Sequence, residues 1–281
     1  MVPSMPHTPL AQIHRAQTQK APLQRVAGHF GELMQGRLGP DGPVALVSLP
    51  CPSFWVGTDP DMDFDATLTS ARLVDLCAAL DVPVPDRPIV LGATMPPGGG
   101  AGSSTAGLVA TARALGFSGT PEALARICAQ IEGASDPLMF PQPERLLFAP
   151  REGRILRPLP ALPRFAVLGG FVGPPRRTDP ADTRFADFAD LIVDWCEGMA
   201  VARMAALATQ SAQRSLALRG PALDPTAALA RDLGALGWII AHTGSARGLI
   251  FAPGAVPALG VRALTEAGFT QVVRFDAGGT A

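Results

Sequence analysis

The chain has 281 residues, of which 47% are hydrophobic and 17% charged, and its 23 basic and 24 acidic side chains leave a formal charge of -1. A chain this long and this apolar can bury one large core or two modest ones, which excludes a disordered protein. The balanced charge argues against a nucleic-acid partner, because non-specific binding to phosphodiester backbones depends on clustered Lys and Arg.

Residues 1–20 are polar and contain several prolines, so we expect a mobile leader there. Short hydrophobic runs then predict strands at 43–49, 53–57 and 88–94 around a helix at 70–80. A glycine-rich turn at 96–102 leads into an alanine-rich helix at 104–115. The next helix is expected to begin after Thr120 and to run to about Glu132, because a threonine N-cap followed by Pro and Glu favours a helix start.

The second half predicts a strand at 164–169, followed by an apolar stripe of helical period between Phe185 and Met199 that we expect to face the core. Helices are then expected at 200–218, 225–235 and 256–267, and strands at 237–242, 247–251 and 270–275. Strands outside strict β-α alternation favour an α+β fold over a doubly wound parallel sheet. A proline-rich seam near 155–163 predicts a boundary between domains 21–160 and 161–281.

Lys20 is the chain's one lysine. A Walker-type phosphate loop and a protein kinase each need a lysine at the phosphates, and Schiff-base chemistry needs a lysine amine. Lys20 is followed by Ala21 in the polar leader, so these three classes are excluded. Any cationic help at a transferred phosphate is therefore expected from arginine.

Cysteine and histidine spacing argues against a zinc site, since no C-x-x-C or H-E-x-x-H pattern is present. No apolar stretch approaches the roughly 20 residues that cross a bilayer. The first residues also lack a basic region followed by an apolar core. We therefore expect a cytoplasmic protein with a small-molecule substrate, no nucleic-acid or membrane partner and a possible homodimer.

The strongest local signal is the glycine-rich segment between a predicted strand and a predicted helix: Pro97, Gly98, Gly99, Gly100, Ala101, Gly102, Ser103 and Ser104. Glycines allow the backbone N–H groups to turn inward, and a helix N-terminus adds partial positive charge, so the segment suits a phosphate group. Serine hydroxyls are ligands that Mg²⁺ accepts. From composition alone, a structural glycine turn with a serine N-cap is an equal alternative.

Two other readings of this segment fit less well. The dinucleotide pattern G-x-G-x-x-G would need glycine at position 103 or 105. Gly102-x-Ser104-x-Ala106 approaches the hydrolase elbow G-x-S-x-G, and His242 follows in a suitable order, but the preceding glycine run does not suit that sharp turn.

The run from Pro96 to Ala106 resembles the phosphate loop of the GHMP kinases, which bind ATP without a Walker lysine. Three further segments resemble motifs of that family in the expected order, and the first and the Glu-x-x-x-Asp segment are similar to forms found in the L-threonine kinases of cobalamin biosynthesis and propanediol utilization. They are 27–36 with Gly-Glu-Leu-Met-Gln-Gly, 131–141 with Glu132 and Asp136, and 237–251 with its glycine-rich centre.

The resemblance implies a GHMP kinase fold, with an N-terminal ribosomal-protein-S5-domain-2-like domain and a C-terminal ferredoxin-like domain. It implies ATP and Mg²⁺ as cofactors, with Ser104 and Glu132 as metal ligands and residues 97–104 around the triphosphate. Asp136 would be the base or the orienting group for the acceptor hydroxyl. The substrate side would include His29, Glu32, His242 and Gly244.

The sequence departs from the family pattern at Ala27, in the Gly-Gly-Gly-Ala-Gly loop and at 245–247. Three functions therefore stay open. They are an L-threonine kinase that makes O-phospho-L-threonine for cobalamin, a kinase for another small hydroxylated metabolite such as a homoserine-like compound or an amino alcohol, and an inactive nucleotide-binding regulatory protein.

Overall fold

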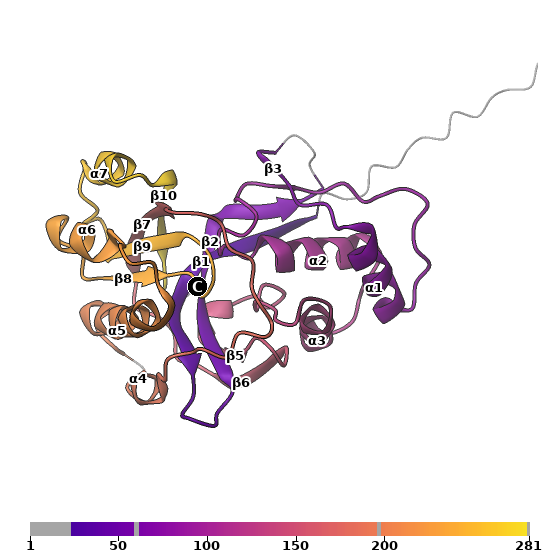
Figure 1. The fold of residues 1–281 in the computed structure, drawn as a ribbon, viewed down its shortest axis with the longest axis horizontal. Coiled ribbons are helices and arrows are strands. Elements are labelled where there is room, and N and C mark those ends of the chain that lie inside the picture. Colours follow the sequence, from indigo (N-terminus) through magenta and orange to yellow (C-terminus); the bar gives the residue numbers. More distant parts are fainter. Residues whose placement is uncertain (1–23, 59–61, 196–197, 280–281) are drawn as a thin grey trace, which may run out of the picture.

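The computed structural model describes residues 24–58, 62–195 and 198–279. The leader expected at 1–20 lies outside the described residues. Within the described part, ten strands form one sheet in the order β10-β7-β9-β8-β1-β2-β4-β3, and β5 and β6 extend from β2. Helices group at the two ends of this sheet (Figure 1). The α+β expectation is confirmed.

A long antiparallel hairpin of β1 (Arg25–Arg37) and β2 (Val44–Gly57) forms the middle of the sheet. The strands predicted at 43–49 and 53–57 are thus one strand. Its register jumps between Trp55 opposite Ala27 and Cys51 opposite Gly28, so the residues between them bulge. Proline is tolerated in a strand at such bulges, which is why Pro52 does not end β2.

The remaining strands of the first half are short: β3 (Phe64–Asp65), β4 (Gly92–Ala93), β5 (Leu146–Ala149) and β6 (Arg154–Pro158). The strand predicted at 88–94 is therefore reduced to two residues. Ladder pairing is confined to Gly92 and Ala93, and Pro88 has no N–H with which to extend it.

The second half contributes β7 (Phe165–Phe171), β8 (Gly237–Ile240), β9 (Ala246–Phe251) and β10 (Thr270–Ala277). Residues in these strands alternate between two cores, as the period of a strand requires. Val167 and Ile250 belong to the main core, whereas their neighbours Leu168 and Leu249 pack into a smaller one. Both faces of this part of the sheet are therefore covered.

The helices of the first half are α1 (Ser70–Leu80), α2 (Ser103–Ala114) and α3 (Pro121–Glu132). Thr120 caps α3 by accepting a hydrogen bond from the backbone N–H of Ala123, as predicted. Gly133 ends this helix in the left-handed conformation at φ 75°. The chain therefore leaves the helix directly after Glu132, and Asp136 lies in the following loop.

The helices of the second half are α4 (Ala189–Val193), α5 (Val201–Arg219), α6 (Thr226–Asp232) and α7 (Gly260–Glu266). The apolar stripe predicted around α4 is buried at Phe188, Ile192 and Trp195, but only five residues are helical. Phe185 departs from the expectation. It stays half-buried and stacks on a histidine of the pocket described below.

The two expected domains share the sheet, because β1 pairs with β8 through Glu32 opposite Ile240. The boundary at 160/161 stays a prediction. Among the described residues, no helix is both long and apolar enough to span a membrane.

Candidate active site

The glycine-rich loop between β4 and α2 is held in place through its carbonyl groups. Gly98 O accepts from the N–H of Arg176 at 2.9 Å, and Gly99 O accepts from the N–H groups of Ser245 and Ala246, both at 2.9 Å. Gly100 has φ +80°, and a side chain there would overlap the Thr243 carbonyl. Only glycine fits this conformation and this close approach.

Helix α2 begins directly after the loop with Gly102 as its N-cap. A glycine cap has no side chain to accept from the N–H groups of the first turn, and these groups have no partner within the helix. The first turn, at Ser103, Ser104 and Thr105, lines a pocket of about 400 Å³. The N-terminus of α2 therefore presents donors and partial positive charge to this pocket.

Ser104 and Glu132 meet at the same end of the pocket. The Ser104 hydroxyl donates to Oε1 of Glu132. Arg72 of α1 contacts both oxygens, with Nη1 2.7 Å from Ser104 Oγ and 3.0 Å from Glu132 Oε1. Burial raises the pKa of Glu132, although Ser104 and Arg72 act in the opposite direction. The pair of hard oxygen donors suits a divalent cation such as Mg²⁺.

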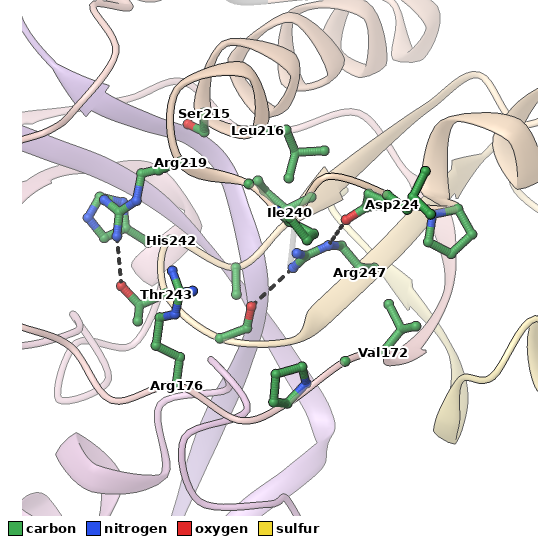
Figure 2. Close-up of a pocket in the computed structure, with 18 residues that line it drawn as sticks. Val172, Arg176, Ser215, Leu216, Arg219, Asp224, Ile240, His242, Thr243 and Arg247 are labelled. Carbon is green, nitrogen blue, oxygen red and sulfur yellow. Dashed lines mark hydrogen bonds and ion pairs between the residues drawn. The ribbon is translucent and has the colours of Figure 1, made fainter.

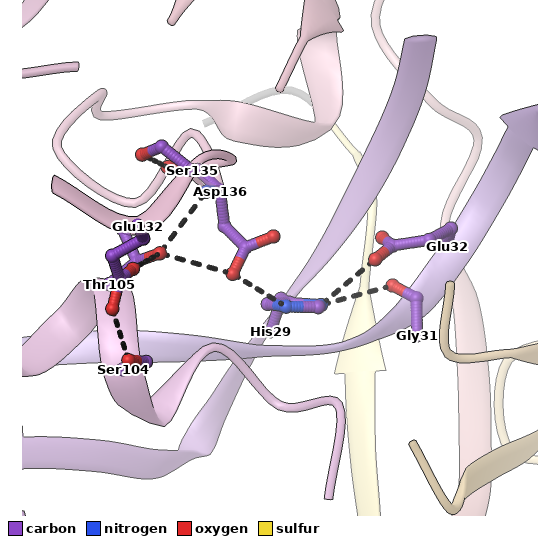
Figure 3. A network of polar contacts seen from close by, with 8 residues as sticks. All are labelled: His29, Gly31, Glu32, Ser104, Thr105, Glu132, Ser135 and Asp136. Atoms are coloured by element: carbon purple, nitrogen blue, oxygen red, sulfur yellow. Dashed lines mark hydrogen bonds and ion pairs between the residues drawn. The ribbon is translucent and has the colours of Figure 1, made fainter. Parts of the chain in front are cut away.

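Thr105 connects this pair to Asp136. Its hydroxyl lies 3.3 Å from Oε2 of Glu132 and 3.4 Å from Oδ2 of Asp136, and it accepts from the Asp136 N–H at 3.2 Å (Figure 3). The Asp136 side chain is 26% exposed, so its carboxylate is reachable from the pocket. Helix α3, its left-handed end and the threonine hydroxyl together fix where this carboxylate lies.

His29 of β1 lies between two carboxylates. Its Nε2 is 3.4 Å from Oδ2 of Asp136, and its Nδ1 is 3.6 Å from Oε1 of Glu32. Burial alone lowers the pKa of His29, but the charges of Glu32 and Asp136 outweigh it and raise this pKa to about 9. Burial raises the pKa of Glu32 to about 7. Burial also disfavours ionised Asp136, but His29 outweighs it and lowers the pKa of that carboxyl.

The ligand atoms of His29, Glu32 and Asp136 lie within 4.8 Å of one another, which is compatible with a metal centre. A metal-bound imidazole must be deprotonated. Without a bound cation, the charges of Glu32 and Asp136 hold the pKa of His29 at about 9, and the three side chains then form an ion-pair network.

The opposite side of the pocket is basic. Arg219, at the end of α5, pairs with Asp182 at 3.3 Å, and its guanidinium lies 4.8 Å from the Phe185 ring. Phe185 stacks on His242 with ring centroids 4.9 Å apart. Burial, followed by the charge of Arg219, lowers the pKa of His242 to about 3, so this imidazole is neutral. Arg151 and Arg176 line the same side.

The structure brings most of the sequence-predicted residues to one pocket: His29, Glu32, Pro97, Gly98, Gly100, Gly102, Ser103, Ser104, Glu132, Asp136 and His242. Three others lie behind its wall. Ala101 is buried and its carbonyl accepts from the N–H of His29 at 3.1 Å. Gly99 anchors the loop. Gly244 packs against it, since a Cβ there would lie 2.5 Å from Gly100 N.

Residues 68–140, which include the loop, Glu132 and Asp136, match the family described as GHMP kinases N terminal domain. A search of curated protein sequences gives no match.

Solved structures match over nearly the whole chain. Mevalonate kinase from methicillin-resistant Staphylococcus aureus MRSA252 is 16% identical, covers 92% of this chain and 99% of its own, and gives a TM-score of 0.55. Methanococcus jannaschii mevalonate kinase gives 0.54 at 11% identity, with 94% and 100% covered. Homoserine kinase from Cytophaga hutchinsonii gives 0.50 at 16% identity, with 94% and 96% covered. The chain has the GHMP kinase fold.

Within this fold, four site residues were missed by sequence reasoning: Arg72, Thr105, Phe185 and Arg219. Thr105 adjoins Ser104 in the motif, so its position was available from the sequence. Arg72 and Arg219 are 2 of 22 arginines, and no spacing marks them. Phe185 shares the apolar period of the residues that follow, and only its stacking on His242 distinguishes it.

Proposed function

We propose that the protein is a kinase that transfers the γ-phosphoryl group of ATP to a hydroxyl of a small metabolite, with L-threonine as the acceptor. One observation carries the proposal. The first turn of α2, the Ser104–Glu132 pair and the Asp136 carboxylate are joined through Thr105 at one pocket. Phosphoryl transfer requires this combination of anion binding, oxygen ligands and a carboxylate beside the acceptor.

In this proposal, the N–H groups of the glycine loop and the first turn of α2 hold the triphosphate. Asp136 orients the acceptor hydroxyl and accepts its proton as the new bond to Pγ forms. The bond from Pγ to the bridging oxygen breaks, and ADP leaves with that electron pair. His29 keeps Asp136 ionised, because a cation 3.4 Å from the carboxylate favours its charged form.

Ser104 and Glu132 are the residues that would hold Mg²⁺. Their oxygens already face one cation, the Arg72 guanidinium, which supports a donor set that favours positive charge. Mg²⁺ held there would supply positive charge to offset that of the phosphate oxygens. Arg72 lies where an arginine can add to this neutralisation, as the shortage of lysine predicts.

An amino acid acceptor requires an anion for its ammonium group and a cation for its carboxylate. Glu32 is 1% exposed, and its Oε2 has no hydrogen-bond partner among the described residues. Arg219 on the opposite side supplies the cation. The sequence alone did not locate this second group. An amino alcohol lacks the carboxylate and would leave Nη1 of Arg219 without an acceptor, so the two groups together favour threonine over that alternative.

The test is a substrate panel. Purified protein with Mg-ATP is incubated with L-threonine, L-serine, L-homoserine and the corresponding amino alcohols, and phosphorylated products are identified by mass spectrometry. The proposal predicts O-phospho-L-threonine as the preferred product, for use in cobalamin biosynthesis. Phosphorylation of a different acceptor would support the kinase activity and refute threonine as the acceptor. ATP binding without any product supports the regulatory protein instead.

The proposal also includes a cytoplasmic location, where ATP is available, and a homodimer. Light scattering of the purified protein tests the dimer, since a monomer has a mass of 29.1 kDa.

A further inference from the structure

A second pocket of about 310 Å³ lies behind the turn that carries His242 and Thr243 (Figure 2). Its walls come from the end of α5, the segment 220–225 that follows it, and the turn between β8 and β9. It shares Arg176, Arg219, His242 and Thr243 with the main pocket, and its other lining residues are separate. Its volume is at the lower end of the range for small-molecule sites.

The lining of this second pocket is apolar on its sides, where Val172, Leu216 and Ile240 lie. Its one acidic side chain is already neutralised. Asp224 pairs with Arg247 at 2.8 Å, both side chains are less than 10% exposed, and Asp224 also accepts from the N–H of Thr226 at 3.0 Å. The acid therefore does not attract a cationic ligand.

The charge left over in the second pocket is positive. Arg176 lines this pocket and forms no ion pair within the described part of the chain. Arg219, which lines both pockets, pairs with Asp182, but its Nη1 is buried without a hydrogen-bond partner among the described residues. Buried donors are normally satisfied, so an unpartnered guanidinium nitrogen indicates a place for an acceptor. Apolar walls with a basic end fit an organic anion that has a short hydrocarbon body.

The wall of the second pocket is also the support of the glycine loop. Arg247 donates to the Gly244 carbonyl at 3.2 Å, and Gly244 packs directly on the backbone of Gly99 and Gly100. Ser245 N–H donates to Gly99 O on the same side of the turn. A ligand that contacts this turn from behind therefore contacts the residues that position the loop.

We propose that the second pocket is an effector site for a small organic anion, either a carboxylate or a phosphate monoester with a short alkyl chain, and that its occupancy changes nucleotide affinity through the turn at 242–247. The two sites share one packed turn, which is the element on which both ligands would act. The binding half of this proposal does not depend on the proposed kinase activity. The coupling half depends only on nucleotide binding at the loop.

The test measures binding of two probes, hexanoate and butyl phosphate, to the full chain by calorimetry, with and without saturating Mg²⁺ and a non-hydrolysable ATP analogue. Saturation with the analogue keeps butyl phosphate out of the main phosphate site. We expect at least one probe to bind about tenfold more tightly than inorganic phosphate or hexanol. Inorganic phosphate lacks the hydrocarbon chain, and hexanol lacks the negative charge. Which of the two binds better identifies carboxylate or phosphate as the head group.

Two variants test whether the probes bind in the second pocket. Leu223 lies at the pocket and is 91% exposed, so Leu223→Glu should weaken anion binding at least fivefold without disturbing the fold, while Leu223→Gln retains it. Leu216→Trp fills the pocket from α5 and should abolish binding. Leu218→Trp is its control, because Leu218 lies on the same helix at 46% exposure and away from the pocket.

The coupling is measured as the ratio of nucleotide Kd with and without the bound probe, and we expect a change of about fivefold or more. Absence of saturable binding, wild-type affinity in both Leu223→Glu and Leu216→Trp, or an unchanged nucleotide Kd would each overturn the proposal. A further outcome separates the two proposals. If the nucleotide does not bind, but the probes bind the wild-type protein and do not bind Leu216→Trp, the proposed kinase activity is refuted and the anion site is retained.

Discussion

Nε2 of His29 lies 3.4 Å from Oδ2 of Asp136, and the same imidazole faces Glu32 through Nδ1. A protonated histidine between two carboxylates keeps the outer one ionised and ready to accept a hydroxyl proton. The first motif thus lies, through His29, beside the residue to which we assign the chemistry.

Asp136→Asn should lower kcat by about 10²- to 10⁴-fold, because an amide does not accept the hydroxyl proton. Nucleotide affinity should stay within a few-fold of wild type, since the loop and α2 are unchanged. Steady-state kinetics and calorimetry measure the two effects. Asp75→Asn, an exposed position on α1, is the control. Full turnover in Asp136→Asn would remove the assigned role.

Stability should fall as the pH rises from 7 to 9. The folded protein keeps a proton on His29 up to a pKa of about 9, whereas the unfolded chain releases it near 6.5. The stabilising contribution is therefore complete below pH 6.5 and lost through pH 9, and the full shift corresponds to something on the order of 3 kcal/mol. Urea unfolding at several pH values measures it.

His29→Gln tests this assignment. The variant should be less stable than wild type at pH 7, and its free energy of unfolding should change little between pH 7 and 9. A decline as steep as that of wild type would show that another group titrates.

Glu132→Gln should raise the Mg²⁺ concentration needed for half-maximal activity by about 10- to 100-fold, because a carboxylate oxygen is lost beside Ser104. Glu122→Gln, an exposed residue in the first turn of the same helix, should leave that concentration unchanged. A Mg²⁺ titration at fixed ATP separates the two. Equal titration curves for the two variants would contradict the metal assignment.

Arg219→Gln should raise the KM for an amino acid acceptor by about tenfold or more and leave the KM for ATP unchanged, because the lost cation faces the acceptor side. Arg203→Gln is the matched control on α5, at a side chain 52% exposed. An effect on ATP with none on the acceptor would refute the proposed carboxylate contact.

Gly100→Ala should destabilise the protein and weaken nucleotide binding more than tenfold, because its Cβ would overlap the Thr243 carbonyl. Gly116→Ala is the control that separates the effect of steric overlap from that of backbone strain. Gly116 has φ +88° and nothing within 4 Å of the added Cβ, so this variant should lose only about 1 kcal/mol of stability and no affinity. Similar nucleotide affinities in the two variants would show that the close approach has no role.

Local signals predicted much of the fold. The cap at Thr120, the helix end at Glu132 and the periodic helices lie within a few residues of their expected positions, because such signals act over one or two turns. β1 was not predicted as a strand, since its glycines at 28, 31 and 36 weaken the pattern and its pairing with β2 and β8 supplies the order.

The site residues also fall into two groups, those marked by a local sequence signal and those brought in by contacts distant along the chain. Motif positions such as Ser104, Glu132 and Asp136 were available from the sequence because their spacing is short and their chemistry is specific. The basic side, centred on Arg219, depends on how the end of α5 reaches a pocket formed mostly by the first half of the chain. Contacts over that distance along the chain leave no local pattern, and arginine is abundant here.

The central claim is that this pocket moves a phosphoryl group from ATP to a hydroxyl, and mass spectrometry of the acceptor after incubation with Mg-ATP tests it most directly. We predict a gain of one phosphoryl group on L-threonine, present with wild type and with Asp75→Asn and strongly reduced with Asp136→Asn. No phosphorylated product from any acceptor of the panel, together with no binding of ATP, would contradict the account.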